Sequence, residues 1–410
     1  MNILFLSTSD SSGGAAIACL RLVEALREAG HDAKVLVMEK RRTEGWIQAT
    51  ADKWPSWSAA KKHLNYFVQQ KFMTQRGYQY SGILESAVKA DHHPWVGQAD
   101  VLCLHWVNHG FFDEAALRRL FSLQKPVLWH MHDFWAFTGG CHYPGKCREF
   151  ESSCKNCPAL KPFFKSAASH KWEQRLKTFE INPPVLVGAS QWLANEAQKS
   201  ALHVVAKVAH VPNPLDPDFV PRDKERCRGE LALNPNKRYL LFAAMNVGDV
   251  RKGFHLLKEA LKAMDPEKVG CLVAGKFKPQ QLSDLSLEVR ALGPLNKTTM
   301  IQAYNAADVF VIPSLEENLP NTVLESLSCG TPVAGFAVGG IPEMVSSGKN
   351  GFLSTSLNAQ GLALAIESAF HLADKTPRLA QNCIDSVSRF KPAAIAEKYA
   401  ALIMDALENN

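Results

Sequence analysis

Long apolar runs, fixed-period repeats and low-complexity tracts are all missing from this chain of 410 residues. No apolar run reaches the roughly 18 residues that suggest a membrane-spanning helix, so we expect no transmembrane segment. The first 16 residues hold a five-residue apolar core with no basic stretch before it, which argues against a secretory signal. With 46% hydrophobic and 21% charged residues, the composition is that of a folded globular chain.

A strong excess of one charge is also missing. The net charge is +6, from 46 Lys+Arg and 40 Asp+Glu, which is too mild to indicate nucleic-acid binding. The excess lies in one half, because residues 1–200 carry 24 Lys+Arg and 18 Asp+Glu, whereas residues 201–410 carry 22 of each. This asymmetry predicts two domains with different partners. The basic half suits an anionic lipid surface or an acidic acceptor, and a simple solvated surface is the alternative.

Short apolar runs alternate with helical patterns along the chain. The strand-like runs are residues 2–6, 35–38, 101–104, 127–129, 185–187, 239–243, 271–274, 309–312 and 332–335. Because strands separated by helices form parallel sheets covered on both faces, the fold class is predicted as α/β with two doubly wound domains. Residues 210–223 contain four prolines and predict a hinge. Such folds bind ligands beyond the carboxyl ends of their strands, most simply in an inter-domain cleft.

Two carboxylates stand out after the apolar run 309–312. Glu317 lies in a loop and Glu325, eight residues on, lies in a predicted helix in which Pro320 takes the first position. Carboxylates accept paired hydrogen bonds from vicinal hydroxyls, which suits sugar rings, and the N–H groups of a helix start suit phosphate oxygens. Alternatively, acidic residues near a helix start only complement its dipole.

A basic pair precedes another predicted helix, at Arg251-Lys252-Gly253. Cations at a helix start oppose the helix dipole, so a bound anion such as a diphosphate explains them better. An exposed basic loop is the alternative interpretation.

Polar residues also follow the predicted strands of the first half. Gly13-Gly14 follows the first strand, where glycine permits close approach of a ligand, although paired glycines more commonly form turns. His130-Met131-His132-Asp133 follows the strand that ends at Trp129, and His105 follows the strand before it. Strand ends suit ligand-binding groups, and a satisfied structural histidine is the alternative for each.

Four of the ten cysteines gather within 17 residues, at Cys141, Cys147, Cys154 and Cys157. The last two form a CxxC pair, and four thiolates can complete a closed, structural zinc site. Disulfides and unliganded thiols remain alternatives. The other cysteines are scattered, as small core residues are, and the chain shows no secreted disulfide framework.

Residues 54–80 mix seven aromatic residues with four basic ones. Such a stretch can lie on an anionic membrane interface. An ordinary amphipathic helix on the first domain is the alternative.

The segment 313–345 resembles the donor-binding signature of the retaining GT-B glycosyltransferases of family 4. The matching positions are Pro313-Ser314, Glu317, Glu325, Cys329-Gly330-Thr331-Pro332-Val333 and Gly339-Gly340-Ile341-Pro342-Glu343. The resemblance covers nearly the whole chain and is densest from 238 to 353. It implies two Rossmann-like domains, an acceptor domain over 1–211 and a donor domain over 212–387, with a C-terminal helix at 388–410 that packs back on the first.

The resemblance also implies roles for individual residues. Glu317 would contact the donor sugar, Glu325 the ribose, and Lys252 the pyrophosphate, while His132 would lie by the donor sugar. The backbone at Gly13 and Gly14 would approach the donor phosphates. The family's usual Gly-Phe-Gly is replaced here by Asn318-Leu319-Pro320. Because proline has no N–H, the phosphate cradle must use Asn321 and Thr322. The family's usual arginine is not evident, and Arg251 is the substitute.

We therefore expect a retaining glycosyltransferase that uses a UDP-, GDP- or ADP-sugar. Its catalytic residues are Glu317, His132 and Lys252, and its acceptor side includes His105 and Asp133. The acceptor is expected to be a glycan or a lipid-linked acceptor of polysaccharide or glycoconjugate synthesis. No catalytic metal and no nucleic acid are expected, and the protein is placed in the cytoplasm or on the inner face of the membrane. The alternatives are a nucleotide-sugar epimerase or hydrolase of the same fold, and a non-catalytic sugar-nucleotide binding module.

Overall fold

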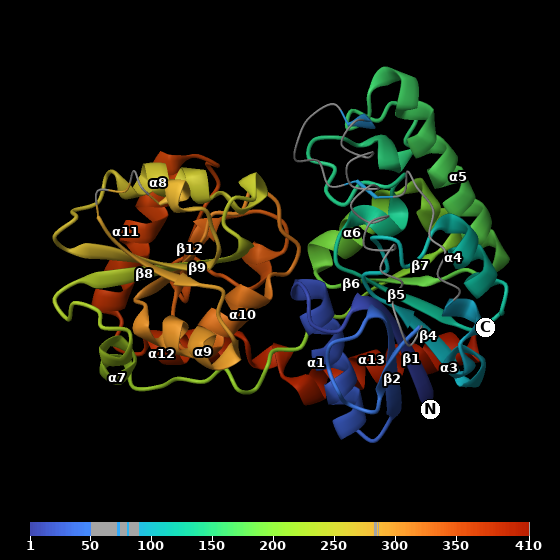
Figure 1. Ribbon diagram of the computed structural model, residues 1–410, viewed down its shortest axis with the longest axis horizontal. Helices are drawn as coiled ribbons and strands as arrows, with labels where there is room; N and C mark the ends of the chain where they lie inside the picture. Colours follow the sequence, from blue (N-terminus) through green and yellow to red (C-terminus); the bar gives the residue numbers. More distant parts are fainter. Residues whose placement is uncertain (51–71, 74–79, 82–89, 283–284, 286, 410) are drawn as a thin grey trace. The chain divides into compact units, whose positions relative to one another are not determined.

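The structure is a computed structural model, and it describes residues 1–50, 72–73, 80–81, 90–282, 285 and 287–409. The chain divides into two compact units (Figure 1). Unit 1 comprises Met1–Pro214 and Pro392–Asn410, and unit 2 comprises Leu215–Lys391. Most of the aromatic and basic stretch 54–80 lies outside the described residues, so its membrane contact stays a prediction. Within the described residues, no helix has both the length and the apolar character needed to cross a bilayer.

Unit 1 contains, in its described part, a seven-stranded parallel sheet in the order β3-β2-β1-β4-β5-β6-β7. Its strands are β1 (Asn2–Ser9), β2 (Asp32–Glu39), β3 (Ile47–Ala49), β4 (Val101–Leu104), β5 (Val127–Met131), β6 (Val185–Gly188) and β7 (Lys207–His210). The strand order reverses between β1 and β4. In open α/β sheets such a reversal opens a ligand crevice at the carboxyl ends of the two strands.

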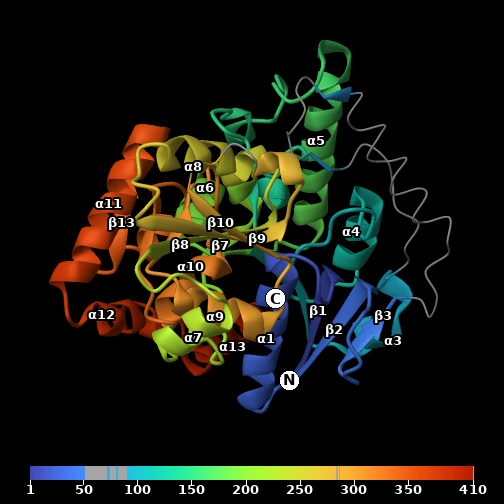
Figure 2. The ribbon, with the colours of Figure 1, turned by 60° about the vertical axis from the view of Figure 1, so that its left-hand side comes forward.

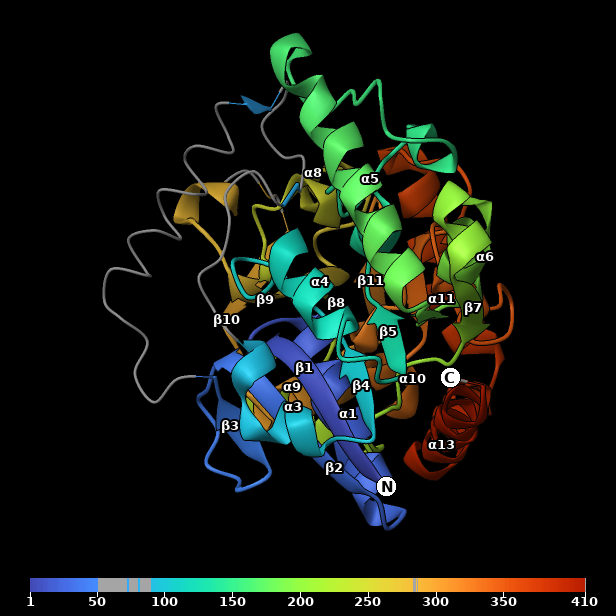
Figure 3. The ribbon, with the colours of Figure 1, turned by 90° about the vertical axis from the view of Figure 1, so that its right-hand side faces the viewer.

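Side chains that alternate along the strands of this sheet pack into two separate cores, one on each face. In β1, Ile3 and Phe5 join the core on one face, and Leu4 and Leu6 join the core on the other. The helices of unit 1 are α1 (Gly14–Glu28), α3 (Pro94–Gln98), α4 (Glu114–Phe121), α5 (Lys165–Ile181), α6 (Gln191–Lys199) and α13 (Pro392–Glu408). Helices α4 and α5 lie side by side on the face of Leu4 (Figure 3).

The last helix of the chain completes the other core of unit 1. Helix α13 packs beside α1, and Figures 1 and 2 draw the two together. The buried ring of Tyr399 stacks on Phe5 of β1, with 6.1 Å between ring centroids. Strand β1, near the N-terminus, is thus covered in part by α13, near the C-terminus.

Unit 2 holds, among its described residues, a six-stranded parallel sheet in the order β10-β9-β8-β11-β12-β13. The strands are β8 (Arg238–Asn246), β9 (Val269–Lys276), β10 (Glu288–Gly293), β11 (Val309–Ile312), β12 (Val333–Phe336) and β13 (Gly351–Ser354). The helices are α7 (Lys224–Glu230), α8 (Phe254–Leu261), α9 (Lys297–Ala306), α10 (Asn321–Ser328), α11 (Ala359–Lys375) and α12 (Leu379–Ser386). Helices α8 and α11 cover one face, and α9 and α10 the other (Figure 2). Here the order reverses between β8 and β11.

The predicted α/β fold with two parallel sheets is confirmed, and two local predictions are wrong. Strand β5 continues past Trp129 to Met131, because His130 and Met131 still pair with β6, so His130 lies inside the strand. Pro320 is not the first helical residue. Its ψ of 121° is extended, which makes it the N-cap and starts α10 at Asn321.

Candidate functional site

The predicted site residues form two groups, each following strands next to the reversal point of its own sheet. In unit 1 the group follows β1, β4 and β5 and comprises Gly13, Gly14, His105, His132 and Asp133. In unit 2 the group follows β8 and β11 and comprises Arg251, Lys252, Glu317, Asn321, Thr322 and Glu325. Both places are those where doubly wound sheets bind ligands.

An ion pair joins the two loops of the unit 2 group. The Nζ atom of Lys252 lies 2.6 Å from Oε2 of the buried Glu317, and Nη1 of Arg251 lies 4.0 Å from the same oxygen. Burial raises the pKa of Glu317, but Lys252 and Arg251 outweigh it and hold that pKa below its ordinary value. Glu317 is therefore a carboxylate at neutral pH, with two cations beside it.

Close backbone packing fixes this ion pair. Gly253 has a φ of 70°, and a Cβ atom there would lie 1.8 Å from the carbonyl oxygen of Pro313. Only glycine lets the loop after β8 approach the end of β11 so closely. The backbone N–H of Leu315 also donates to the carbonyl of Arg251 at 2.8 Å. The basic residues and Glu317 are thus held together by the fold itself.

Glu325 lies apart from this ion pair, on α10. It is 8% exposed, and its Oε2 atom accepts a hydrogen bond from the hydroxyl of Tyr304 at 3.2 Å. Asn321 and Thr322 are the first two residues of α10, and the N-terminus of a helix favours anions. The sequence prediction missed Tyr304, because a single tyrosine forms part of none of the motifs described above.

The unit 1 group is built around the buried His105 and His130 and the half-buried His132. The Nδ1 atom of His105 lies 2.9 Å from Nε2 of His132, so one ring donates to the other. The ring of His130 stacks on that of His105, and its Nε2 donates to Oδ1 of Asn213 at 3.2 Å. Burial lowers the pKa of His132 to about 4, and Asp133 opposes this only partly. Burial also holds the pKa values of His105 and His130 well below the ordinary range.

Asp133 is occupied by protein donors. Its carboxylate accepts from Nδ1 of His142 at 2.7 Å, from Nε1 of Trp106 at 3.1 Å and from the backbone N–H of Trp135 at 2.8 Å. Burial raises the pKa of Asp133, but His142 and these hydrogen bonds bring it below the ordinary value. The geometry makes Asp133 a positioning residue that holds the loop after β5. Its expected place on the acceptor side stays a prediction.

The glycine loop after β1 is held by a carboxylate that the sequence prediction missed. Asp10 is fully buried, and it accepts the backbone N–H groups of Arg41 and Arg42 at 2.8 Å each. Gly13 has a φ of 91° and caps α1, and Gly14 is exposed at the first position of that helix. An acidic residue directly after an apolar strand was the available signal for Asp10.

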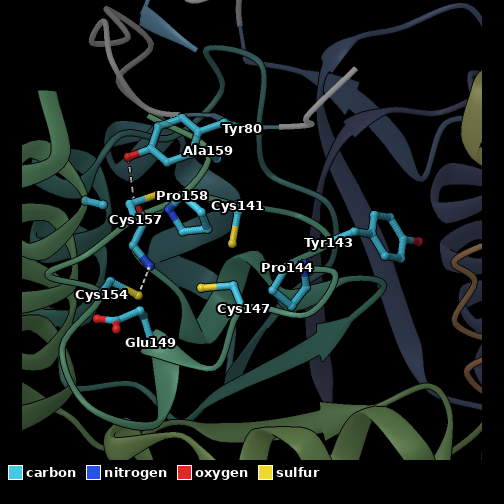
Figure 4. Close-up of a pocket in the computed structure, with 12 residues that line it drawn as sticks. Tyr80, Cys141, Tyr143, Pro144, Cys147, Glu149, Cys154, Cys157, Pro158 and Ala159 are labelled. Carbon is cyan, nitrogen blue, oxygen red and sulfur yellow. Dashed lines mark hydrogen bonds between the residues drawn. The ribbon is translucent and has the colours of Figure 1, made fainter. Parts of the chain in front are cut away.

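The four clustered cysteines line one small cavity in unit 1 (Figure 4). All ten cysteines are described, and none forms a disulfide. In the described part of the chain, no three His, Cys, Asp or Glu side chains already converge as metal ligands. Zinc therefore stays a prediction at this point.

Comparison with known proteins agrees with this architecture. Residues 237–371, all in unit 2, match the family model described as "Glycosyl transferases group 1". A "D-inositol 3-phosphate glycosyltransferase 2" of Catenulispora acidiphila is 28% identical over 249 residues, which cover 54% of this chain and 58% of the relative. The chain spans about half the length of the curated relatives it matches.

Two solved structures resemble almost the whole chain. Sucrose-phosphate synthase from Thermosynechococcus elongatus has a TM-score of 0.69 and 18% identity, over 100% of this chain and 99% of that one. Anabaena HepE in complex with UDP has a TM-score of 0.65 and 19% identity, over 99% and 100%. The likeness establishes the fold, which is that of GT-B glycosyltransferase structures.

The lowered pKa of His132 leads to a prediction about how stability depends on pH. The pKa of His132 is about 4 in the fold and 6.5 ordinarily, so the unfolded chain takes up a proton first as the pH falls. Its contribution to stability is present above pH 6.5 and is lost as the pH falls towards 4, by up to about 3 kcal/mol. Urea unfolding between pH 7 and pH 4 should show this loss. The variant His132→Gln should show a shallower pH slope, and the exposed-site control His203→Gln an unchanged one. Equal slopes in all three proteins would contradict the assignment.

Proposed function

We propose that this protein is a glycosyltransferase that moves a sugar from a nucleotide-sugar donor to an acceptor hydroxyl. The observation that carries the proposal is the arrangement of Lys252 and Arg251 beside the buried carboxylate of Glu317, next to the reversal point of the second sheet. A diphosphate needs adjacent cations, and a sugar needs a hydrogen-bond acceptor beside them. The family match of residues 237–371 supports the same activity.

The donor belongs to unit 2 in this proposal. Lys252 and Arg251 stabilise the charge that develops on the leaving diphosphate, together with the backbone N–H groups of Asn321 and Thr322 at the start of α10. Fixed cations supply this stabilisation without a catalytic metal. Glu325, held by Tyr304, accepts hydrogen bonds from the ribose hydroxyls. The UDP bound to HepE supports a UDP-sugar as the first donor to try.

The state of Glu317 supports transfer with retention as the form of this proposal. A carboxylate between two cations has a lowered pKa, so it is a weak base that serves better as an acceptor for donor-sugar hydroxyls than as a nucleophile. The acceptor hydroxyl then attacks on the face from which the diphosphate leaves. The new glycosidic C–O bond forms, the C–O bond to the phosphate breaks, and the acceptor proton passes to a phosphate oxygen.

The acceptor belongs to unit 1 in this proposal. His132 is neutral at pH 7, so it can donate or accept one hydrogen bond to a sugar without adding charge. The basic excess of residues 1–200 favours an acidic glycan or a lipid-linked acceptor at the inner face of the membrane. Polysaccharide or glycoconjugate synthesis is the corresponding role. An inositol phosphate, the acceptor in the name of the Catenulispora relative, is one small compound to test.

A ligand screen followed by a product assay tests the proposal. We expect one of UDP, GDP or ADP, and its sugar conjugates, to raise the unfolding temperature of the protein. The stabilising nucleotide sugar is then incubated with and without acceptors such as inositol phosphate. Release of nucleoside diphosphate that depends on an acceptor supports transfer. A changed sugar nucleotide without acceptor would indicate an epimerase, release without acceptor a hydrolase, and binding with no turnover a binding module.

Lys252→Ala should selectively weaken the binding of the diphosphate part of the ligand. Losing one charge-assisted hydrogen bond costs roughly 1.5–3 kcal/mol. The affinity for the nucleoside diphosphate should therefore fall about ten- to a hundredfold in calorimetry. The affinity for the nucleoside alone should hardly change. Lys262→Ala, which removes an exposed lysine that forms an ion pair with Glu259 in unit 2, is the control and should bind both ligands normally. If the affinities for both ligands fall alike in Lys252→Ala, the residue has a structural role.

Substitutions of Glu325 and of Glu317 should have different effects, the first on nucleotide binding and the second on sugar transfer. Glu325→Gln loses a charged acceptor for the ribose and should weaken nucleoside diphosphate binding about tenfold. Glu317→Gln replaces the charged acceptor for the sugar by a weaker neutral one, so it should slow transfer while the free diphosphate still binds. Calorimetry with the nucleoside diphosphate and single-turnover transfer rates measure the two effects. Equal losses of affinity in both variants would refute this division of roles.

A further inference from the structure

Residues 138–164 of unit 1 form a long connection between the single turn Phe134–Phe137 and helix α5. Its only regular structure is two short turns, Glu149–Glu151 and Pro162–Phe164. Connections of this length without their own helices or strands are uncommon in compact domains, and when ordered they need another constraint. Isolated β-bridges of Cys141 with Tyr80 and of Leu160 with Met73 hold this connection near its two ends.

The four cysteines of this connection surround one space. Cys141, Cys147, Cys154 and Cys157 all line the same cavity, and Figure 4 draws their side chains around it. The cavity has a volume of about 20 Å³, which holds about one sphere of the size of a water molecule. A single ion fits this volume, whereas an organic ligand does not.

The backbone is arranged to donate to one of the sulfur atoms. The N–H of Gly139 points at Sγ of Cys154, at 3.2 Å. Gly139 passes so close to α5 that a Cβ atom there would lie 2.3 Å from the carbonyl oxygen of Ala168. N–H donors of this kind stabilise a thiolate and orient it towards a metal.

Cys154 also occupies an unfavourable backbone conformation. Its φ is 53°, in the left-handed region that glycine and asparagine adopt most readily. A cysteine at such a position lowers the stability of the fold, so its presence calls for a role of the side chain. The cost is understandable if the thiol of Cys154 is a ligand.

We propose that Cys141, Cys147, Cys154 and Cys157 bind one structural zinc ion in unit 1. Four thiolates are a donor set that favours zinc and satisfies its tetrahedral coordination, leaving no open position for catalysis. Their side chains rotate about Cα–Cβ to close on the ion, and each thiol releases its proton on binding.

The zinc site has a direct connection to the predicted acceptor side. His142 follows Cys141 in the chain, and its ring donates to Asp133, which adjoins His132. Fixing Cys141 therefore fixes His142, and His142 fixes the loop that carries His132. Loss of zinc should disturb unit 1 and leave nucleotide binding by unit 2 intact.

Metal content of the wild-type protein is the first test, and it does not depend on the proposed function. Untagged protein purified without added metal or chelator should contain about one zinc per chain by elemental analysis. Removal of the metal with a chelator should expose four additional titratable thiols. Replacement by cobalt should give the visible absorption bands of a tetrahedral cobalt thiolate. Metal-free protein with all four thiols titratable overturns the proposal, and so do missing thiols that return only on reduction, which indicate disulfides.

A matched pair of variants makes the assignment specific. Cys154→Ala should lose its zinc and unfold at a lower temperature. Cys383→Ala, a buried cysteine of unit 2, should keep the metal at the wild-type level. Calorimetry with the nucleoside diphosphate should give the same affinity for chelator-treated and zinc-loaded wild type. If Cys154→Ala retains a full zinc content, Cys154 is not a ligand and the four-cysteine site is wrong. If Cys154→Ala does not fold, the metal content and cobalt spectrum of the wild type decide.

Discussion

The candidate donor site depends on one buried carboxylate and the two cations that neutralise it. Glu317 is almost fully buried, and an isolated charge at such a place would be strongly unfavourable. Lys252 and Arg251 remove that penalty, and all three residues come from loops that glycine and backbone hydrogen bonds hold against each other. The same cations suit a second anion, which is why the proposed diphosphate is assigned to this place in unit 2.

The two sheets explain why site residues so far apart in sequence fall into compact groups. In both units the strand order reverses next to the first strand of the sheet, between β1 and β4 and between β8 and β11. Connections on either side of such a point leave in opposite directions, which opens a space at the carboxyl edge. The loops after these strands carry the glycine pair and His105 in unit 1, and the basic pair and Glu317 in unit 2.

The periodicity of the sequence was sufficient for the fold class, because alternating buried strands and amphipathic helices allow few other arrangements. It could not predict contacts between distant residues. Three sets of hydrogen bonds join segments whose spacing carries no periodic signal. They are the bond from Tyr304 to Glu325, the bond between His105 and His132, and the bonds from the backbone N–H groups of Arg41 and Arg42 to Asp10. The strand end at Met131 was missed because pairing with β6, and not local propensity, keeps His130 extended.

The position of α13 has a consequence for how the chain folds during synthesis. One apolar face of the first sheet, which includes Phe5, is covered partly by α1 and partly by α13, a helix that leaves the ribosome only after all of unit 2. Unit 2 has its own continuous core and can fold while unit 1 still exposes that surface. A nascent chain that ends before residue 392 therefore leaves part of this apolar face uncovered, which favours aggregation.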